Sequence, residues 1–375
     1  MKSIQIYAIA IACVVTAAAV CTYIVLSDDD EVPGSILTDA AGNQIQIPDS
    51  IGSITAASPS IADIVCYMGY GSKIVAVSTS CTHPNIPSGT PTVGSYTSPS
   101  TDGISTANAD VTFIDGSNTN AVNAYNTLRD AGMRVIMMFG SRDTADGIYK
   151  NVEIIGKVMK DASWEGIVTD LKAEVALLKD ITKSAPTTRI LLSTGLGNLT
   201  TDSSGNFTDL TGFTGAGVYL AGIDSAQMSM ISGVSKMTTP VSGSGWVSAD
   251  TDFISTSTGN VDMLIVLWTN KPAMPNSTAI ADLIVKMKSM SSWGNCGAVK
   301  NGNIVFIGGD AGSDLSRVTP YTVYNGLTLM SLYINPGSYS LTAGGTALKL
   351  SDLPQCVESS SVLATLVGYT KNKAA

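Results

Sequence analysis

The feature that most constrains the fold is an alternation of short apolar runs with helical segments, which occurs twice along the chain. The apolar runs of the first series are residues 73–78, 110–115 and 134–140, with a helical pattern at 123–132. Those of the second series are 189–195, 261–268 and 303–309, with helical patterns at 277–290 and 320–333. Continuous apolar strands joined through helices are typical of parallel sheets that are covered on both faces.

Between the two series, residues 164–183 carry apolar side chains at helical spacing. This stretch predicts one helix of about twenty residues, ~30 Å long. The fold class expected is therefore α/β, with two Rossmann-like lobes joined by one long helix. The predicted domains are an N-terminal α/β lobe at 35–143, helices including the interlobe helix at 144–185, and a C-terminal α/β lobe at 186–375. A small hairpin is expected around residues 41–43.

The N-terminus predicts a transmembrane anchor. The run from Ile4 to Leu26 has no charged residue, and Lys2 precedes it while residues 28–31 are acidic. A helix of that length spans roughly 35 Å, enough to cross a bilayer. The positive-inside bias places everything after residue 27 outside the cell. Residues 1–27 are therefore interpreted as an anchor or signal segment, and 28–34 as a linker. Cleavage near Ala17–Ala19 is the alternative, although the run is long for a signal peptide.

The cysteines agree with an extracytoplasmic location. Two of the six, Cys13 and Cys21, lie in the apolar N-terminal run. The other four are even in number and form no CxxC motif, so a zinc or redox site is not expected. They are disulfide candidates, with Cys66 able to pair with Cys81 and Cys296 with Cys356. Four buried free thiols are the alternative.

Composition argues against several classes of function. A net charge of −9 and an isoelectric point of about 4.6 leave no basic surface for nucleic acid. The chain has one histidine, which excludes multi-histidine metal sites and leaves little for acid–base catalysis. GxSxG, HExxH and P-loop motifs are absent from the sequence. We therefore expect no enzyme activity, no intrinsic cofactor and no bare metal site.

The order of several motifs carries a resemblance to a known family. The motifs are "TDAAGNQIQIPDS", "SITAASPSIADIVCYMGYGSKIVAVS", "CTHPNIPSGTPTVGSY", "STDGISTANADVTFID", "VSADTDFISTSTGNVDMLIVL", "SWGNCGAVKNGNIVFIGG" and "LSRVTPY". In this order they resemble the helical-backbone class of periplasmic substrate-binding proteins of ABC importers, which carry cobalamin, haem and ferric siderophores. The resemblance covers roughly residues 35–340, and residues 200–245 do not align with it.

The resemblance implies an extracytoplasmic protein that captures a metal chelate between two lobes and delivers it to an ABC permease and its ATPase. A corrinoid or other tetrapyrrole is the first choice of ligand and a ferric siderophore the second. We expect a monomer on the extracellular face of the membrane, anchored by residues 4–26, or secreted or lipid-anchored after cleavage. A cell-surface ligand sensor and a surface-layer or adhesion protein, both without a transporter, are the alternatives.

Candidate ligand-binding residues lie in loops that follow strands, because ligands bind outside the carboxyl ends of strands in α/β lobes. They are Ser58, Ser60, His83, Tyr96, Arg142, Trp246, Trp268 and Arg317. The aromatic rings are expected to stack on a flat macrocycle, the arginines to grip peripheral acids, and the histidine to supply one axial ligand to a chelated metal.

Two acidic residues are candidates for contact with the permease. The resemblance implies that Asp102 and Asp250, one in each lobe, dock onto permease arginines. Helix N-caps are the alternative, since both precede apolar helical stretches and Asp is a favoured cap.

Overall fold

The computed structural model describes residues 35–140, 145–269, 271–339 and 347–359. The internal contacts of the chain define two units. Residues 35–36 and Gln46–Asp49 are the described part of the short unit, and the large unit contains the other described residues. The predicted anchor and linker lie outside the described residues, as do Cys13, Cys21 and Arg142. Within the described ranges, no helix has the length and apolar character needed to cross a bilayer.

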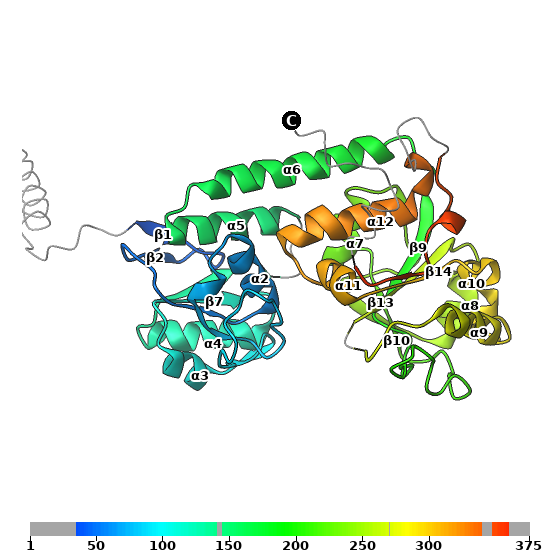
Figure 1. The fold of residues 1–375 in the computed structure, drawn as a ribbon, viewed down its shortest axis with the longest axis horizontal. Helices are drawn as coiled ribbons and strands as arrows, with labels where there is room; N and C mark the ends of the chain where they lie inside the picture. The colour runs from blue at the N-terminus through cyan, green and yellow to red at the C-terminus, as the bar shows by residue number, and fades with distance from the viewer. Residues whose placement is uncertain (1–34, 141–144, 270, 340–346, 360–375) are drawn as a thin grey trace, which may run out of the picture. The chain divides into compact units, whose positions relative to one another are not determined.

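The N-terminal lobe is built on a parallel four-stranded sheet in the order β4-β3-β7-β8. Figure 1 labels β7 of this sheet. Its strands are β3 Ile54–Ala56, β4 Ile74–Val77, β7 Val111–Asp115 and β8 Val135–Met138. Two hairpins accompany it, β1 Ile36–Thr38 with β2 Gln44–Gln46 and β5 Gly94–Ser95 with β6 Ser98–Pro99. Its helices are α2 Pro59–Tyr67, η1 Gly71–Lys73, α3 Thr101–Ala107 and α4 Thr119–Asp130.

Local sequence explains these elements. The residues of β3 and β7 are buried throughout, as expected for central strands covered on both faces. Helix α4 buries Ala121, Ala124, Tyr125 and Leu128, which recur at helical spacing and pack with the core of this lobe. The side chain of Asn118 caps this helix by accepting from the N–H of Ala121.

Two consecutive helices connect the sheets. They are α5 Ala145–Met159 and α6 Ser163–Thr182, so the predicted long helix is confirmed. A glycine permits their close approach, because a Cβ at Gly156 would lie less than 3 Å from the ring of Trp164. Helix α6 packs against α5 and also against two helical segments of the second lobe, η3 Thr322–Gly326 and α12 Leu327–Ile334. Figure 1 shows α6 beside α5 and α12. The domain boundaries drawn from the sequence remain predictions.

The C-terminal lobe contains the second sheet, in the order β12-β10-β9-β13-β14-β15, with β11 paired to β9. Its strands are β9 Thr188–Ser193, β10 Val218–Ala221, β11 Met237–Thr238, β12 Trp246–Ala249, β13 Met263–Trp268, β14 Ile304–Gly308 and β15 Cys356–Val357. Strand β10 runs antiparallel to β9 and to β12, while β9, β13, β14 and β15 are parallel. The sheet of this α/β lobe is therefore mixed, with both parallel and antiparallel strands.

The helices of this lobe follow the strands in sequence. They are α7 Ala226–Ser232, α8 Thr251–Ser257, α9 Ser277–Lys288, η2 Trp293–Asn295, α10 Gly297–Asn301, α11 Gly309–Ser316, the π-helix η3 Thr322–Gly326, α12 Leu327–Ile334, η4 Pro336–Ser338 and η5 Leu350–Asp352.

The core of this lobe corrects one prediction from the sequence. Trp268, expected in an exposed loop, is the last residue of β13 and is 2% exposed. Its ring packs edge-on against Phe207 and Phe306, and its Nε1 donates to the carbonyl of Ala273 at 2.9 Å. Nζ of Lys271 lies over the ring, 5.3 Å from its centroid. The expectation of an exposed loop is therefore wrong for Trp268, whose side chain is part of the core, and its role in ligand binding remains a prediction.

Candidate functional site

The candidate site is a polar cluster where residues of the two lobes meet, and helix α2 supplies its first member. Helix α2 has nine residues, and six of the eight other than Asp63 are buried and almost all apolar. Asp63 is the one acidic side chain in this helix, and only 4% of it is exposed. A charge in such a place needs a partner, because burial of an unpaired carboxylate is costly.

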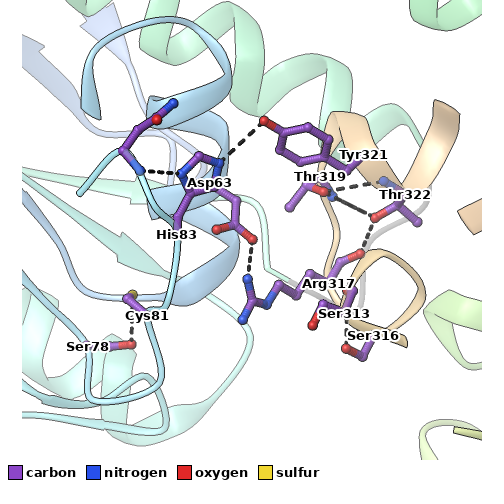
Figure 2. Close-up of polar contacts among 11 residues, drawn as sticks. Asp63, Ser78, Cys81, His83, Ser313, Ser316, Arg317, Thr319, Tyr321 and Thr322 are labelled. Atoms are coloured by element: carbon purple, nitrogen blue, oxygen red, sulfur yellow. Dashed lines mark hydrogen bonds and ion pairs between the residues drawn. The ribbon is translucent and has the colours of Figure 1, made fainter. Parts of the chain in front are cut away.

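The partner of Asp63 comes from the other lobe, 254 residues later in the chain. Nη1 of Arg317 donates to Oδ2 of Asp63 at 2.6 Å, as Figure 2 shows. The arginine side chain is 21% exposed and that of the aspartate 6%, so this ion pair is largely shielded from water. Arg317 is therefore already compensated by a carboxylate of the chain itself.

A tight turn after α11 holds Arg317 in place. Its N–H donates to the carbonyl of Ser313 at 3.1 Å, and its own carbonyl accepts from Oγ1 of Thr322. The N–H of Thr319 in turn donates to Oγ1 of Thr322 at 3.0 Å (Figure 2). These bonds fix the main chain between the end of α11 at Arg317 and the start of the π-helix η3 at Thr322, and π-helical turns are frequent at functional sites.

A second contact joins His83 to Tyr321. Nδ1 of His83 accepts from the N–H of Asn85 at 3.2 Å, so the neutral ring carries its proton on Nε2. Nε2 then donates to the hydroxyl of Tyr321 at 3.4 Å (Figure 2). The sole histidine thus lies at the same meeting point as the Asp63–Arg317 pair.

Tyrosine rings close one side of this cluster. Tyr67 packs edge-on against Tyr321, with ring centroids 5.2 Å apart, and stacks on Tyr324 at 6.5 Å. Ser60, Asp63 and Tyr67 are spaced three and four residues apart, so they share one face of α2. At one end of that face Tyr67 contacts the rings of Tyr321 and Tyr324, and at the other end Ser60 is half-buried.

Burial dominates the electrostatics of the cluster. It raises the pKa of Asp63 above its ordinary value, and the charge and hydrogen bond of Arg317 only partly oppose this effect. Burial also raises the pKa of Tyr321, and the negative charge of Asp63 adds to the shift. The cluster is therefore a low-dielectric region in which hydrogen bonds are strong and unpaired charges are costly.

The remaining candidate residues for ligand binding lie in different surroundings. Ser58 precedes α2 and donates from Oγ to Oδ2 of Asp115 at 3.3 Å, at the carboxyl end of β7. Tyr96 stands at the tip of the β5–β6 hairpin and is 37% exposed, as expected for a loop. Trp246 does not lie in a loop, since it begins β12 and pairs with Ala221 of β10. Ligand binding by these residues remains a prediction.

The two acidic residues proposed for docking are exposed at helix N-termini. Asp250 is the N-cap of α8, and its carboxylate accepts from the N–H of Phe253 at 2.7 Å. Asp102 lies in the first turn of α3, whose N-cap is Ser100. The capping interpretation is therefore confirmed for Asp250 and wrong for Asp102.

All four cysteines within the described ranges are free thiols. Cys66 and Cys296 are buried, while Cys81 and Cys356 are half-buried. Burial raises the pKa of both Cys66 and Cys356 to about 12. The two disulfide pairings remain predictions. Among the described residues, no group of three or more histidine, cysteine or acidic side chains is placed to hold a metal ion.

Two members of this cluster, His83 and Arg317, were among the residues predicted from the sequence to bind ligand. Asp63, Tyr67 and Tyr321 were not predicted. A signal for Asp63 was present, because a single acid within the apolar run "PSIADIVCY" requires a buried partner. The partner itself has no local signature.

A cavity of about 530 Å³ lies elsewhere, among helices α5, α6, α7 and α12. Its lining includes Tyr149, Lys172, Val175, Met230 and Leu327. It contains no candidate residue chosen from the sequence and no member of the Asp63 cluster.

Comparison with known proteins identifies the fold. A family model described as "periplasmic binding protein" matches residues 54–311. A periplasmic haem-binding protein of Pseudomonas aeruginosa superposes with a TM-score of 0.59 at 16% identity, covering 80% of this chain and 99% of that one. A periplasmic vitamin B12-binding protein of Vibrio cholerae gives 0.55 at 15% identity, covering 76% and 96%. A possible iron-binding protein of Staphylococcus epidermidis gives 0.55 at 19% identity, covering 76% and 98%.

At these identities the solved structures share the two-lobe fold with this chain, and nothing finer follows from them. No curated protein sequence matches the chain.

Proposed function

Since the chain belongs to the periplasmic binding protein family, we propose that it is the substrate-binding component of an ABC importer that captures a metal chelate between its lobes. The family is one of binding proteins rather than enzymes. Solved proteins of the same fold are named for haem and vitamin B12, which supports a tetrapyrrole or corrinoid as ligand, with a ferric siderophore as second choice.

The observation that carries the proposal is the meeting of polar side chains from both lobes, the buried Asp63 and the half-buried His83, Arg317 and Tyr321. A binding protein that holds its ligand between lobes needs polar groups that converge from both sides. No described group of side chains suits a bare cation. A chelate, which carries its own metal, fits a site with one histidine.

Titration of the purified chain with cobalamin, haem and a panel of ferric siderophores tests the proposal. At least one should bind with a dissociation constant of a micromolar or tighter, about −8 kcal/mol. The absorbance spectrum and mass of any molecule that co-purifies provide an independent check. Tight binding of free zinc or molybdate, with no chelate bound, would falsify the proposal.

Two aromatic residues test where the ligand lies. Tyr96→Ala and Trp246→Ala should each weaken binding by roughly 1–3 kcal/mol if their rings stack on a macrocycle. The buried Trp268 is not a suitable control, since its removal disturbs the core. Unchanged affinity in both variants removes these residues from the site and leaves the Asp63 cluster as the remaining location.

Delivery to a permease is tested separately through Asp102 and Asp250, which are exposed in separate lobes. Replacing both by lysine should lower ligand import in cells and leave ligand affinity of the purified protein unchanged. Import at the wild-type rate would argue against docking through these residues and favour a role as ligand sensor.

A further inference from the structure

The two carboxylate oxygens of Asp63 differ in what they contact. Oδ2 accepts from Arg317 at 2.6 Å, whereas Oδ1 is buried and has no hydrogen-bond partner among the described residues. A buried oxygen without a donor costs free energy comparable to a lost hydrogen bond. The aspartate is 4% exposed, so bulk water does not readily satisfy it.

Neighbouring polar groups have other partners. His83 bonds to Tyr321 and Asn85, and Sγ of Cys81 lies 3.5 Å from Oγ of Ser78. Arg317 uses Nη1 on the other carboxylate oxygen. The carboxylate of Asp63 is thus paired with Arg317 through Oδ2, while Oδ1 accepts no hydrogen bond among the described residues. This oxygen lies at the place where the lobes meet.

The charge of the pair limits what can fill this position. Asp63 and Arg317 together carry no net charge, so a further cation is not required. A ligand carboxylate facing Oδ1 has no proton to donate at neutral pH and is repelled by the like charge of the aspartate. A neutral N–H or O–H group satisfies the oxygen and adds no charge to the low-dielectric cluster.

We propose that Oδ1 of Asp63 accepts a hydrogen bond from a neutral amide or hydroxyl donor on the bound chelate, and that the site selects ligands with an amide-bearing rim over ligands with a carboxylate-bearing rim. The inference rests on the proposed function and narrows its ligand class. It favours corrinoids, whose rim carries amides, over haem, whose rim carries propionates.

A matched pair of ligands tests the selection directly on the full chain. Dicyanocobinamide and dicyanocobyrinic acid share one metal and one ring, and their rims carry amides and carboxylic acids respectively. Wild-type protein should bind the amide form at least tenfold more tightly. Asp63→Asn supplies an N–H donor and leaves Arg317 uncompensated, so this ratio should fall by tenfold or more.

Two further variants separate recognition from structural pairing. Arg317→Gln breaks the same ion pair but keeps the carboxylate, so the preference for the amide form should persist or grow. Asp102→Asn removes one exposed acid far from the cluster in sequence and should leave the ratio unchanged. Thermal melting of each protein checks its folding, and Asp63→Ser replaces Asp63→Asn if the latter does not fold.

Each outcome decides the matter. An equal ratio in wild type and Asp63→Asn, or the same shift in Arg317→Gln as in Asp63→Asn, overturns the inference. Binding of haem or of the carboxylate corrinoid alone also overturns it and leaves the proposed function standing. If no chelate of any class binds, the proposed function fails and the inference falls with it.

Discussion

Asp63 illustrates at the residue scale how a single side chain depends on distant partners. Its helix buries it among apolar residues, and Arg317 compensates its charge from the other lobe. Removing either partner leaves the other without its counter-charge, which is costly in a shielded position. The pKa values of Asp110 and of the buried thiols likewise depend on the groups that surround these side chains.

Asp110 ties together the starts of two central strands and should make stability depend on pH. Its Oδ2 accepts from the N–H groups of Gly52 at 2.7 Å and Ser53 at 2.9 Å. The Gly52 bond is the main cause that lowers the pKa of Asp110 below 3.8. A lowered pKa in the folded state stabilises the protein above the unfolded-state value, and this is lost as pH falls through the folded value.

We therefore expect Asp110→Asn to lower the free energy of unfolding by roughly 0.5 kcal/mol at pH 7, a small effect because solvent screens this exposed carboxylate. The difference from wild type should shrink as pH falls below about 4. Urea unfolding between pH 7 and pH 3 measures it, with Asp102→Asn as the exposed control. A difference that does not change with pH would show that the carboxylate charge plays no part.

The buried thiols should be chemically inert in the folded protein. Because burial raises the pKa of Cys66 and Cys356 to about 12, only roughly one thiol in ten thousand is ionised at pH 8. Iodoacetamide should label both slowly in native protein and fully after denaturation, as read by peptide mass spectrometry. Failure of Cys66 and Cys81 to label in denatured, unreduced protein would instead reveal a disulfide between these two candidates.

At the scale of elements, the turn of the first hairpin is anchored by one buried carboxylate. Asp39, 4% exposed, accepts from Tyr125 Oη at 2.7 Å and from the N–H of Met137 at 3.0 Å. It also accepts from the N–H groups of Ala41 and Asn43 within the turn. One side chain thus joins the turn, helix α4 and strand β8.

Asp39→Ala should destabilise the protein by about 2–4 kcal/mol, because it leaves the buried donors of Tyr125 and Met137, and two N–H groups of the turn, without an acceptor. Chemical denaturation gives the magnitude. Tyr125→Phe removes one of the bonds to Asp39 and the bond that the hydroxyl accepts from Nδ2 of Asn43 at 2.8 Å. It should cost about 1–2 kcal/mol and serves as the partial control. Equal effects of the two substitutions would mean that the bonds from Met137 and from the turn to Asp39 contribute nothing.

Elements whose residues interact locally were predictable from sequence. The apolar run 110–115 contains β7, and the helical spacing at 164–183 coincides with α6. Both were predictable because burial on two faces and helical periodicity each produce a pattern among residues that are close in sequence. The stretch 200–245 resisted prediction. Its strand β10 is short and antiparallel, and β11 has two residues, so their pairing with β9 and β12 carries little periodic signal.

The site was less predictable than the fold for a physical reason. Whether a tryptophan lies in a core or a cleft depends on what packs against it, and Trp268 is buried by Phe207 and Phe306 from distant segments. The Asp63–Arg317 pair likewise joins residues 254 positions apart. Such contacts arise from topology, and a single sequence does not encode them in any local pattern.

At the scale of the whole molecule, α6 governs how the lobes can move. The helix has twenty residues and packs against elements that accompany both sheets. A continuous helix of ~30 Å resists bending far more than a hinge of extended strands. Motion between the lobes should therefore be small.

Small-angle scattering checks this expectation. Profiles of the protein alone and with a saturating chelate identified by titration should nearly coincide, because closure around one helix changes the radius of gyration little. Introducing two glycines at exposed positions of α6 outside the cavity lining, Ala173 and Leu177, should weaken the helix by about 2 kcal/mol and enlarge the change. A large compaction of the wild-type protein on binding would contradict the role assigned to α6.

The stiffness of α6 has a consequence for traffic at the membrane. Under the proposed function, the two docking residues, Asp102 and Asp250, lie at nearly the same distance from each other in loaded and empty carriers. A permease therefore finds little difference in shape by which to distinguish the two forms. Even a tenfold preference requires ~1.4 kcal/mol of difference in binding free energy. Empty carriers then act as competitive inhibitors of import. Uptake should pass through a maximum and decline as cells make more carrier than there is ligand to fill it.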